Sequence, residues 1–363
     1  MSAGQQLKTA AVRPGDTTRA LTWGFTAAGI VIAGIFFGSR RFKDFDPALI
    51  SYAGASVFAA FGIGYRYTMW LRRPPTRIYW RRSWQLFFSR RILSNAARLL
   101  AAVWKDMLEQ RFIHRRSHLR WAAHIFIFWG CVTAAMVTFP LSFGWIRFET
   151  SAASQQVYQA YVFGIHVLSF DLAGPLAPLV FNVLDISAIL VMIGIFFALW
   201  RRARDRGALA VQQFERDLLP ITLLFAVSIT GLLLTASTHF LRGYHYGFLS
   251  QFHAITVIFT LLYLPFGKFF HIFQRPAQIG VEFYKQAGNE AGMASCASCG
   301  TAYASKLHID DLKLLERELG IRYDLSPQRH YQDICPQCRR KNLALIQDGL
   351  WREERQAVAP VKI

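Results

Sequence analysis

Residues 218–240 read LLPITLLFAVSITGLLLTASTHF, an apolar stretch without a charged side chain. A continuous run of about 18 or more apolar residues is typical of a membrane-spanning helix. Stretches of the same character recur along the chain. The predicted spans are 20–38, 48–70, 119–143, 177–200, 218–240 and 247–273. The sequence therefore predicts an all-α membrane protein with about six transmembrane helices that form a bundle.

The composition of the whole chain agrees with a membrane protein. Of 363 residues, 53% are hydrophobic and only 17% are charged, against about 25% charged residues in soluble domains. Basic residues number 41 and acidic residues 22, which gives a net charge of +19. In a soluble protein this charge would suggest a nucleic-acid partner. Here the arginines cluster beside the spans, where they orient membrane proteins, so we expect membrane lipid and no nucleic acid as a partner.

The basic loops predict how the chain crosses the membrane. The loops 71–118 and 201–216 are rich in arginine and short enough for the positive-inside rule, so both are expected to be cytoplasmic. With six spans, both termini then lie in the cytoplasm, and the polar tail 1–19 lies there too. The chain is therefore expected to be a multi-pass protein of the plasma (inner) membrane. The basic residues within 40–43 oppose this orientation, because they fall in the first outside loop.

The long basic loop 71–118 also carries a helical apolar pattern. The residues that recur at steps of three, four or seven are Phe88, Ile92, Leu99, Val103 and Met107. This pattern predicts an amphipathic helix on the cytoplasmic membrane face. Its expected role is anchoring to anionic lipid, and docking of a partner subunit is the alternative.

Residues 153–173 are moderately apolar but contain Asp171 and are followed by Gly174 and Pro175. We expect them to form an interfacial or re-entrant segment, and a seventh span is the alternative. No internal repeat is visible in the sequence.

Four histidines fall within or beside predicted spans, where ionisable groups are costly and often functional. They are His114 and His124 at the third span, and His253 and His271 along the sixth. A haem with two histidine ligands needs imidazoles from facing helices. On a continuous helix, His253 and His271, 18 residues apart, are separated by about 27 Å along the axis. His114 and His124, ten residues apart, are separated by about 15 Å.

Because these two helices are antiparallel, the spacing predicts two haem b groups. One lies between His114 and His271 near the cytoplasm, and the other between His124 and His253 nearer the outside. His118 competes with His114 as a ligand. However, His118 and His124 are only about 9 Å apart along the helix axis, which is too little for two stacked haems. Histidines that simply form hydrogen bonds between helices are the alternative.

The last span, residues 252–276, reads FHAITVIFTLLYLPFGKFFHIFQRP. Its two histidines 18 residues apart and its Pro-Phe…His…Pro pattern resemble the final helix of the respiratory nitrate reductase gamma-subunit family. That family includes the membrane cytochromes of heterodisulfide-reductase-like and sulfite-reduction complexes. The resemblance covers about residues 110–276, and the ten-residue histidine spacing matches too. The first two spans, the basic loop and the C-terminal cysteines depart from it.

The resemblance implies a four-helix dihaem domain over 119–273, beyond the two helices of 20–70. It also implies a quinol-oxidising subunit of a membrane oxidoreductase complex, which passes electrons to a cytoplasmic iron–sulfur or molybdenum subunit. The expected quinol-site residues are His239, Arg242 and His245, where the fifth and sixth spans meet outside. An ordinary polar loop is the alternative there. Lys268 and Arg275 are expected to contact haem propionates or lipid headgroups.

Residues 285–363 are polar and predict a small cytoplasmic domain that contains two CxxC pairs. The cysteines are Cys296, Cys299, Cys335 and Cys338. Four thiolates in this pattern bind one metal ion tetrahedrally. A zinc ribbon is the first interpretation, and a rubredoxin-like iron site, an iron–sulfur centre or two redox dithiols are alternatives. Cys131 is expected to be a small buried apolar residue.

The resulting functional prediction is a membrane cytochrome b subunit that transfers electrons between the quinone pool and a cytoplasmic redox partner. Two other classes remain open. One is a cofactor-free transporter, although such proteins usually contain repeated halves. The other is a membrane anchor whose zinc domain recruits a partner.

Overall fold

Six helices in the computed structural model are long and apolar enough to cross a membrane, which confirms the predicted fold class. The structure describes residues 15–151, 154–205, 207, 210, 212–290, 292–321, 323–326 and 329–357, so most of the predicted tail 1–19 lies outside the described residues. The six helices are α2 (Asp16–Gly38), α3 (Ile50–Arg72), α7 (His118–Ser142), α8 (Leu176–Arg204), α10 (Leu219–Phe240) and α11 (Tyr246–Tyr263). Short turns precede two of them, η1 (Pro47–Leu49) and the π-helical η3 (Phe214–Leu218).

The chain divides into two compact units. One, here called the membrane unit, comprises residues 17–69 and 101–276, and contains all six long helices apart from their first or last residues. The other, here called the Cys unit, comprises the described parts of 1–16, 70–100 and 277–363. Part of the basic loop therefore belongs to the same unit as the C-terminal cysteines.

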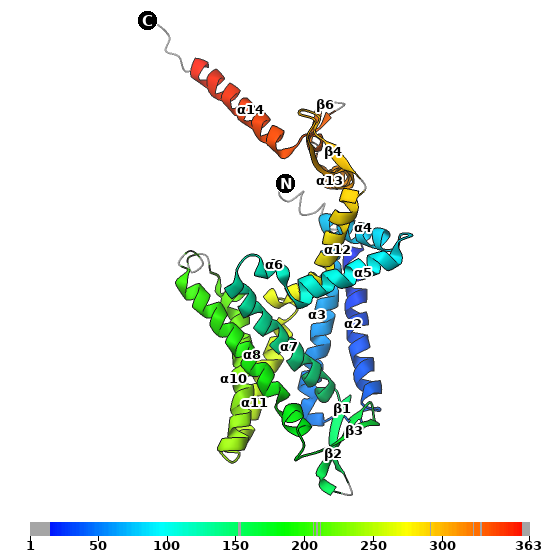
Figure 1. Cartoon of the computed structure of the whole chain (residues 1–363), viewed down its shortest axis with the longest axis vertical. Coiled ribbons are helices and arrows are strands. Elements are labelled where there is room, and N and C mark those ends of the chain that lie inside the picture. Colours follow the sequence, from blue (N-terminus) through cyan, green and yellow to red (C-terminus); the bar gives the residue numbers. More distant parts are fainter. Residues whose placement is uncertain are drawn as a thin grey trace. The chain divides into compact units, whose positions relative to one another are not determined.

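Within the membrane unit, α7, α8, α10 and α11 pack in sequence order, each against the next (Figure 1). Glycines let α7 and α8 approach closely. A Cβ atom on Gly130 would lie 2.7 Å from the carbonyl oxygen of Ser187, and one on Gly194 would lie 2.7 Å from that of Ala123. Small residues at such crossings are typical of helix pairs in membranes, where close backbone contact replaces the hydrophobic effect.

The segment after α7 forms an antiparallel sheet, β1 (Ile146–Ser151), β2 (Ser154–Val162) and β3 (Ile165–Asp171), in that order. Residues 154–162 and 165–171 are thus strands, and the alternative of a seventh helical span was wrong. An aromatic cluster of Phe148, Tyr158 and Phe170 packs this sheet against Phe181 of α8. These cross-strand aromatic contacts explain why a moderately apolar segment forms a sheet.

The basic residues that opposed the predicted orientation lie in a tight turn after α2. Arg40, Arg41 and Phe42 all have left-handed backbone angles, with φ of 55°, 60° and 64°. Arg40 donates to both carboxylate oxygens of the nearly buried Asp44, at 2.6 and 2.5 Å. The Arg40 hydrogen bond lowers the pKa of Asp44. The charge of Arg40, one of the basic residues that oppose the predicted orientation, is therefore neutralised by Asp44 within the turn.

The predicted amphipathic helix is interrupted. The long basic loop contains α4 (Pro74–Phe87), α5 (Ile92–Ala102), the π-helical η2 (Val103–Leu108) and the single turn α6 (Arg111–His114), and of these only α5 and η2 contain residues of the predicted pattern. At the break, the buried Asn95 donates to the backbone carbonyls of Leu86 and Phe87, at 2.9 and 3.3 Å. Asn95 thereby supplies a side-chain donor to carbonyl groups at the end of α4, where the helical hydrogen bonds stop.

The Cys unit contains the remaining elements. They are α12 (His271–Glu290), α13 (Lys306–Glu318), α14 (Pro336–Ala357), β4 (Met293–Ser295), β5 (Ala302–Ser305), β6 (Asp324–Ser326), β7 (Arg329–His330) and η5 (Tyr331–Asp333), although α12 begins in the membrane unit. Arg82 of α4 pairs with Asp311 of α13 at 3.0 Å, and buried Tyr284 of α12 donates to the same carboxylate at 2.6 Å. This shared carboxylate joins three helices.

Candidate functional site

The helix that was predicted to carry both His253 and His271 is broken between them. α11 ends at Tyr263, and the short 3-10 helix η4 (Lys268–Phe270) precedes α12. A Cβ atom on Gly267 would overlap the Tyr263 ring, so a larger residue there would displace that ring. Arg66 of α3 donates to the carbonyls of Pro265 and Phe266, both at 2.5 Å. The break is thus held by a specific contact, and the predicted continuous rise of 18 residues was wrong.

The break brings His271 opposite His124. Their ring centres are 6.3 Å apart and their planes are inclined by 68°. The predicted partner of His271 was His114, so this pairing was wrong. The physical reason is that both helical stretches are interrupted, one at 264–267 and the other at 115–117, where α6 ends and α7 begins.

Each ring of the His124–His271 pair is fixed through its Nδ1 atom. Nδ1 of His124 lies 2.7 Å from Oε1 of the buried Gln110, and Nδ1 of His271 lies 2.6 Å from the backbone carbonyl of Lys268. A carbonyl oxygen only accepts, so each Nδ1 carries the proton. The lone pair then lies on Nε2, for which no described residue provides a hydrogen bond. Metal-binding histidines have this same arrangement.

The other predicted ligand at this end, His114, contacts its competitor His118. Nε2 of His114 lies 3.0 Å from Nδ1 of His118, and the ring of His114 also packs on Trp121 with centres 5.1 Å apart. The two histidines therefore form a pair of their own at the start of α7, on consecutive turns of the chain.

His253 lies deeper along α11 and contacts α10. Its Nδ1 lies 2.8 Å from the hydroxyl oxygen of Thr230, which itself donates to the carbonyl of Ala226 at 2.6 Å. The Thr230 hydroxyl therefore accepts from Nδ1 of His253, and Nε2 again carries the lone pair. No described histidine makes a ring contact with His253, so the predicted pair of His124 with His253 is not formed.

The three predicted quinol-site residues are brought together by one short turn between α10 and α11. His239, Arg242 and His245 are all exposed. Arg242 and His245 have left-handed backbone angles, with φ of 51° and 53°. The fully buried Ser237 stabilises the turn, because its hydroxyl donates to the carbonyl of Tyr244 at 2.7 Å.

Lys268 and Arg275, which were expected to contact propionates or headgroups, have protein partners. Lys268 pairs with Asp217 at 2.8 Å. The guanidinium of Arg275 lies over the ring of Phe112, 4.6 Å from its centre.

The four cysteines of the Cys unit form one cluster that can hold a metal ion. Their sulfur atoms all lie within 4.8 Å of one another. The Sγ of Cys296 accepts from the backbone N–H groups of Cys335 at 3.2 Å and Ser298 at 3.4 Å. The hydrogen bond from Cys335, the largest effect, lowers the pKa of Cys296 to about 6. Backbone N–H groups that point at sulfur favour thiolate, the form that binds metal.

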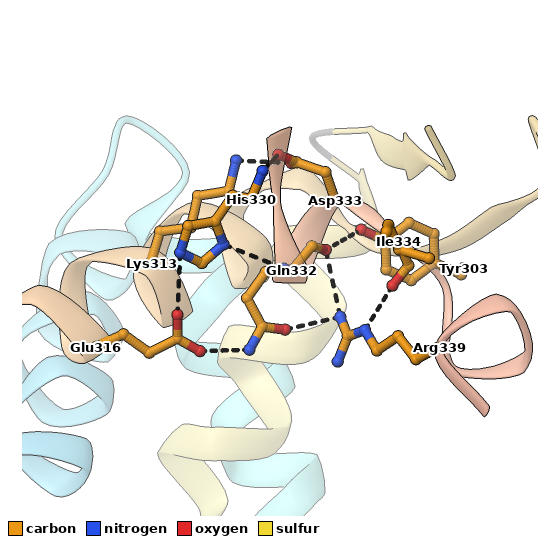
Figure 2. Close-up of polar contacts among 8 residues, drawn as sticks. All are labelled: Tyr303, Lys313, Glu316, His330, Gln332, Asp333, Ile334 and Arg339. Atoms are coloured by element: carbon orange, nitrogen blue, oxygen red, sulfur yellow. Dashed lines mark hydrogen bonds and ion pairs between the residues drawn. The ribbon is translucent and has the colours of Figure 1, made fainter. Parts of the chain in front are cut away.

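A polar network that sequence reasoning missed supports the second knuckle (Figure 2). Arg339 donates to the carbonyl of Ile334 at 2.6 Å and to the side chain of Gln332 at 2.7 Å. Gln332 in turn donates to Glu316, which pairs with His330 at 3.1 Å. The network fixes the backbone immediately before Cys335. No sequence pattern marks it, because its members come from several elements, including α13, β7, η5 and α14.

A second group that sequence reasoning missed lies inside a membrane span. Asp185 of α8 accepts a hydrogen bond from the hydroxyl of Thr235 of α10, at 2.7 Å. The sequence did contain an indication of this group, because Asp185 is the only charged residue of the predicted span 177–200.

Comparison with protein-family models finds no match to this chain, and neither curated proteins nor solved structures match it.

Proposed function

We propose that this chain is a membrane cytochrome b subunit that transfers electrons between the quinone pool and a cytoplasmic redox partner. The observation that carries the proposal is the opposition of His124 and His271, each with Nδ1 bound to a protein carbonyl and Nε2 left to bind metal. The six apolar helices provide the membrane setting.

The spacing of the two rings suits one haem iron. Two imidazoles that bind a metal from opposite sides, each at about 2 Å, have ring centres about 6 Å apart. The observed 6.3 Å agrees with this value. A haem iron held by two histidines supplies reversible one-electron transfer. The protein contributes the orientation of both imidazoles, through Gln110 on one side and the Lys268 carbonyl on the other.

A second haem b would use His253. Its ring is fixed by Thr230, and its Nε2 has the lone pair that a ligand needs. The proposal of two haems therefore needs another ligand opposite His253, which the described histidines do not supply in this arrangement. A measured ratio of haem to protein decides between one and two.

The proposed orientation follows from the arginine-rich loops, which place His271, the Cys unit and both termini on the cytoplasmic side of the plasma membrane. Quinol would then be oxidised near the turn that carries His239, Arg242 and His245. An imidazole there can accept a proton when it lies within hydrogen-bond reach of the quinol hydroxyl. An iron–sulfur or molybdenum subunit is the proposed cytoplasmic acceptor.

For the Cys unit we propose one structural zinc ion. The buried apolar cluster beside this site consists of Cys296, Ile334 and Cys335, with Tyr303 and Cys338 packed against it. Two of its three buried members are proposed metal ligands, so the core of this small region coincides with the proposed metal site. Small domains of this kind gain most of their folding free energy from the bound ion. Iron in the same site is the alternative, which metal analysis of the purified protein distinguishes.

The function is tested by reducing the purified full chain with a short-chain quinol. We expect a reducible b-type absorbance that appears on mixing with quinol. The His166→Ala variant is a matched control, because His166 is an exposed histidine of β3, and it should behave like the wild type. A colourless preparation with normal metal content in the Cys unit would contradict the proposal and favour a transporter or an anchor.

A further inference from the structure

The interhelical contact of Asp185 is unusual because it lies inside the membrane unit. Asp185 is nine residues from the first residue of α8, which corresponds to about 14 Å along the helix axis. Its partner Thr235 is five residues before the end of α10, or about 8 Å. Both values place the contact well within the predicted hydrocarbon layer, toward the end of the bundle where His239 lies.

Among the described residues, the facing segments of the two helices that pack on α8 supply no positive charge to Asp185. It forms no ion pair with a described residue, and the Thr235 hydroxyl at 2.7 Å is its hydrogen-bond donor. Residues 125–142 of α7 and 219–238 of α10 contain no basic side chain. An ionised carboxylate without a cation is expensive in a medium of low dielectric constant, and ionisable groups inside membrane spans are often functional.

Further polar side chains lie between Asp185 and the nearby end of the bundle. On α8, Asn182 lies three residues before Asp185, and on α10, His239 lies four residues after Thr235. Residues three or four apart share one face of a helix. The neighbouring helices α8 and α10 therefore each carry two polar residues on one face, of which the second lies nearer the end of the bundle where His239 is exposed.

We propose that Asp185 is a proton-exchange site: it holds a proton as a neutral carboxylic acid and exchanges it with water at the outer end of the bundle by way of Thr235 and His239. In the exchange, the O–H bond on the Asp185 carboxyl breaks, and an N–H bond on His239 or an O–H bond of water forms. The carboxylate that remains accepts a proton by the reverse step. No electron moves, so the site does not depend on the proposed haem, although quinol chemistry would need such a group nearby.

The test is infrared spectroscopy of the purified full chain in a lipid bilayer, in H2O and in D2O. We expect a protonated-carboxyl C=O band that shifts in D2O and disappears in Asp185→Asn. Asp44→Asn is the matched control and should keep the band, because Asp44 is ion-paired with Arg40. In His239→Ala, the shift in D2O should become at least several-fold slower.

A second variant covers the case in which Asp185→Asn does not fold. Thr235→Val removes the hydrogen bond to Asp185 and should move the band to higher frequency. Absence of a band that responds to either variant would overturn the proposal, because Asp185 would then be ionised. A band that does not shift in D2O would also overturn it, since the carboxyl would be a sealed interhelical contact. Both results are independent of whether the protein binds haem.

Discussion

The Cys cluster and the His124–His271 pair hold their candidate metal ligands in different ways. In the Cys cluster, backbone N–H groups point at the sulfur atoms, two of them each within one knuckle and the third, from Cys335 to Cys296, between the two knuckles. In the histidine pair, each ring depends on one carbonyl oxygen, and the rings face each other only because α11 breaks before His271. The first site is therefore oriented by the backbone of its two knuckles, whereas the second depends on side chains and on the packing of several helices.

The largest effect that this comparison predicts is the unfolding of the cysteine-containing part of the Cys unit on removal of its proposed metal ion. Cys335→Ser, or treatment with a strong chelator, should unfold the cysteine-containing part of this unit, because a structural ion contributes on the order of 10 kcal/mol. Limited proteolysis should then cut within residues 293–335, while far-ultraviolet circular dichroism retains the signal of the membrane helices. Cys131→Ser is the control and should leave proteolysis unchanged. Equal resistance of Cys335→Ser and wild type would show that the four sulfurs bind no structural ion.

A smaller effect is expected from removing one orienting group of the histidine pair. Gln110→Ala deletes the acceptor of the His124 Nδ1–H. Loss of such a partner typically weakens metal binding by about tenfold to a hundredfold. The measurement is the haem retained per protein after dilution in detergent. Gln110→Glu keeps an acceptor and should retain more haem than Gln110→Ala. Identical retention in both variants would contradict the role of Gln110.

The smallest effect concerns an outer contact of the Cys unit. Lys313 and Asp333 form an ion pair at 2.6 Å, with 22% and 33% of their side chains exposed. Lys313→Ala should therefore cost only about 0.5 kcal/mol. Denaturant unfolding of the zinc-loaded protein checks this value. A loss as large as that of Cys335→Ser would mean that the polar network, and not the metal, stabilises the knuckles.

The sequence was most informative where structure depends on neighbouring residues. The six helices were predicted from continuous apolar runs, because a chain in hydrocarbon must satisfy its own backbone hydrogen bonds. The four cysteines were predicted from their spacing, since each CxxC pair forms one knuckle. Their sulfur atoms do lie within reach of one ion.

The pairing of the histidines could not be predicted, because it depends on where helices end. Pro265 and Gly267 were visible in the sequence, but the contacts of Arg66 and Tyr263 that fix the break come from residues distant in the chain or packed across the turn. The same holds for the sheet at 146–171, which depends on aromatic contacts between strands. Asp185 was visible as a lone charge, but its partner on α10 became known only from the structure.

The most direct measurement is the reduced-minus-oxidised absorption spectrum of three variants of the full chain, His124→Ala, His271→Ala and His114→Ala. The facing pair in the structure predicts that His124→Ala and His271→Ala each lose a b-type signal, whereas His114→Ala keeps the haem that those two residues share. Loss of the same signal in His114→Ala and His271→Ala, with His124→Ala affecting a different one, would contradict the structural pairing and restore the pairing expected from helical spacing.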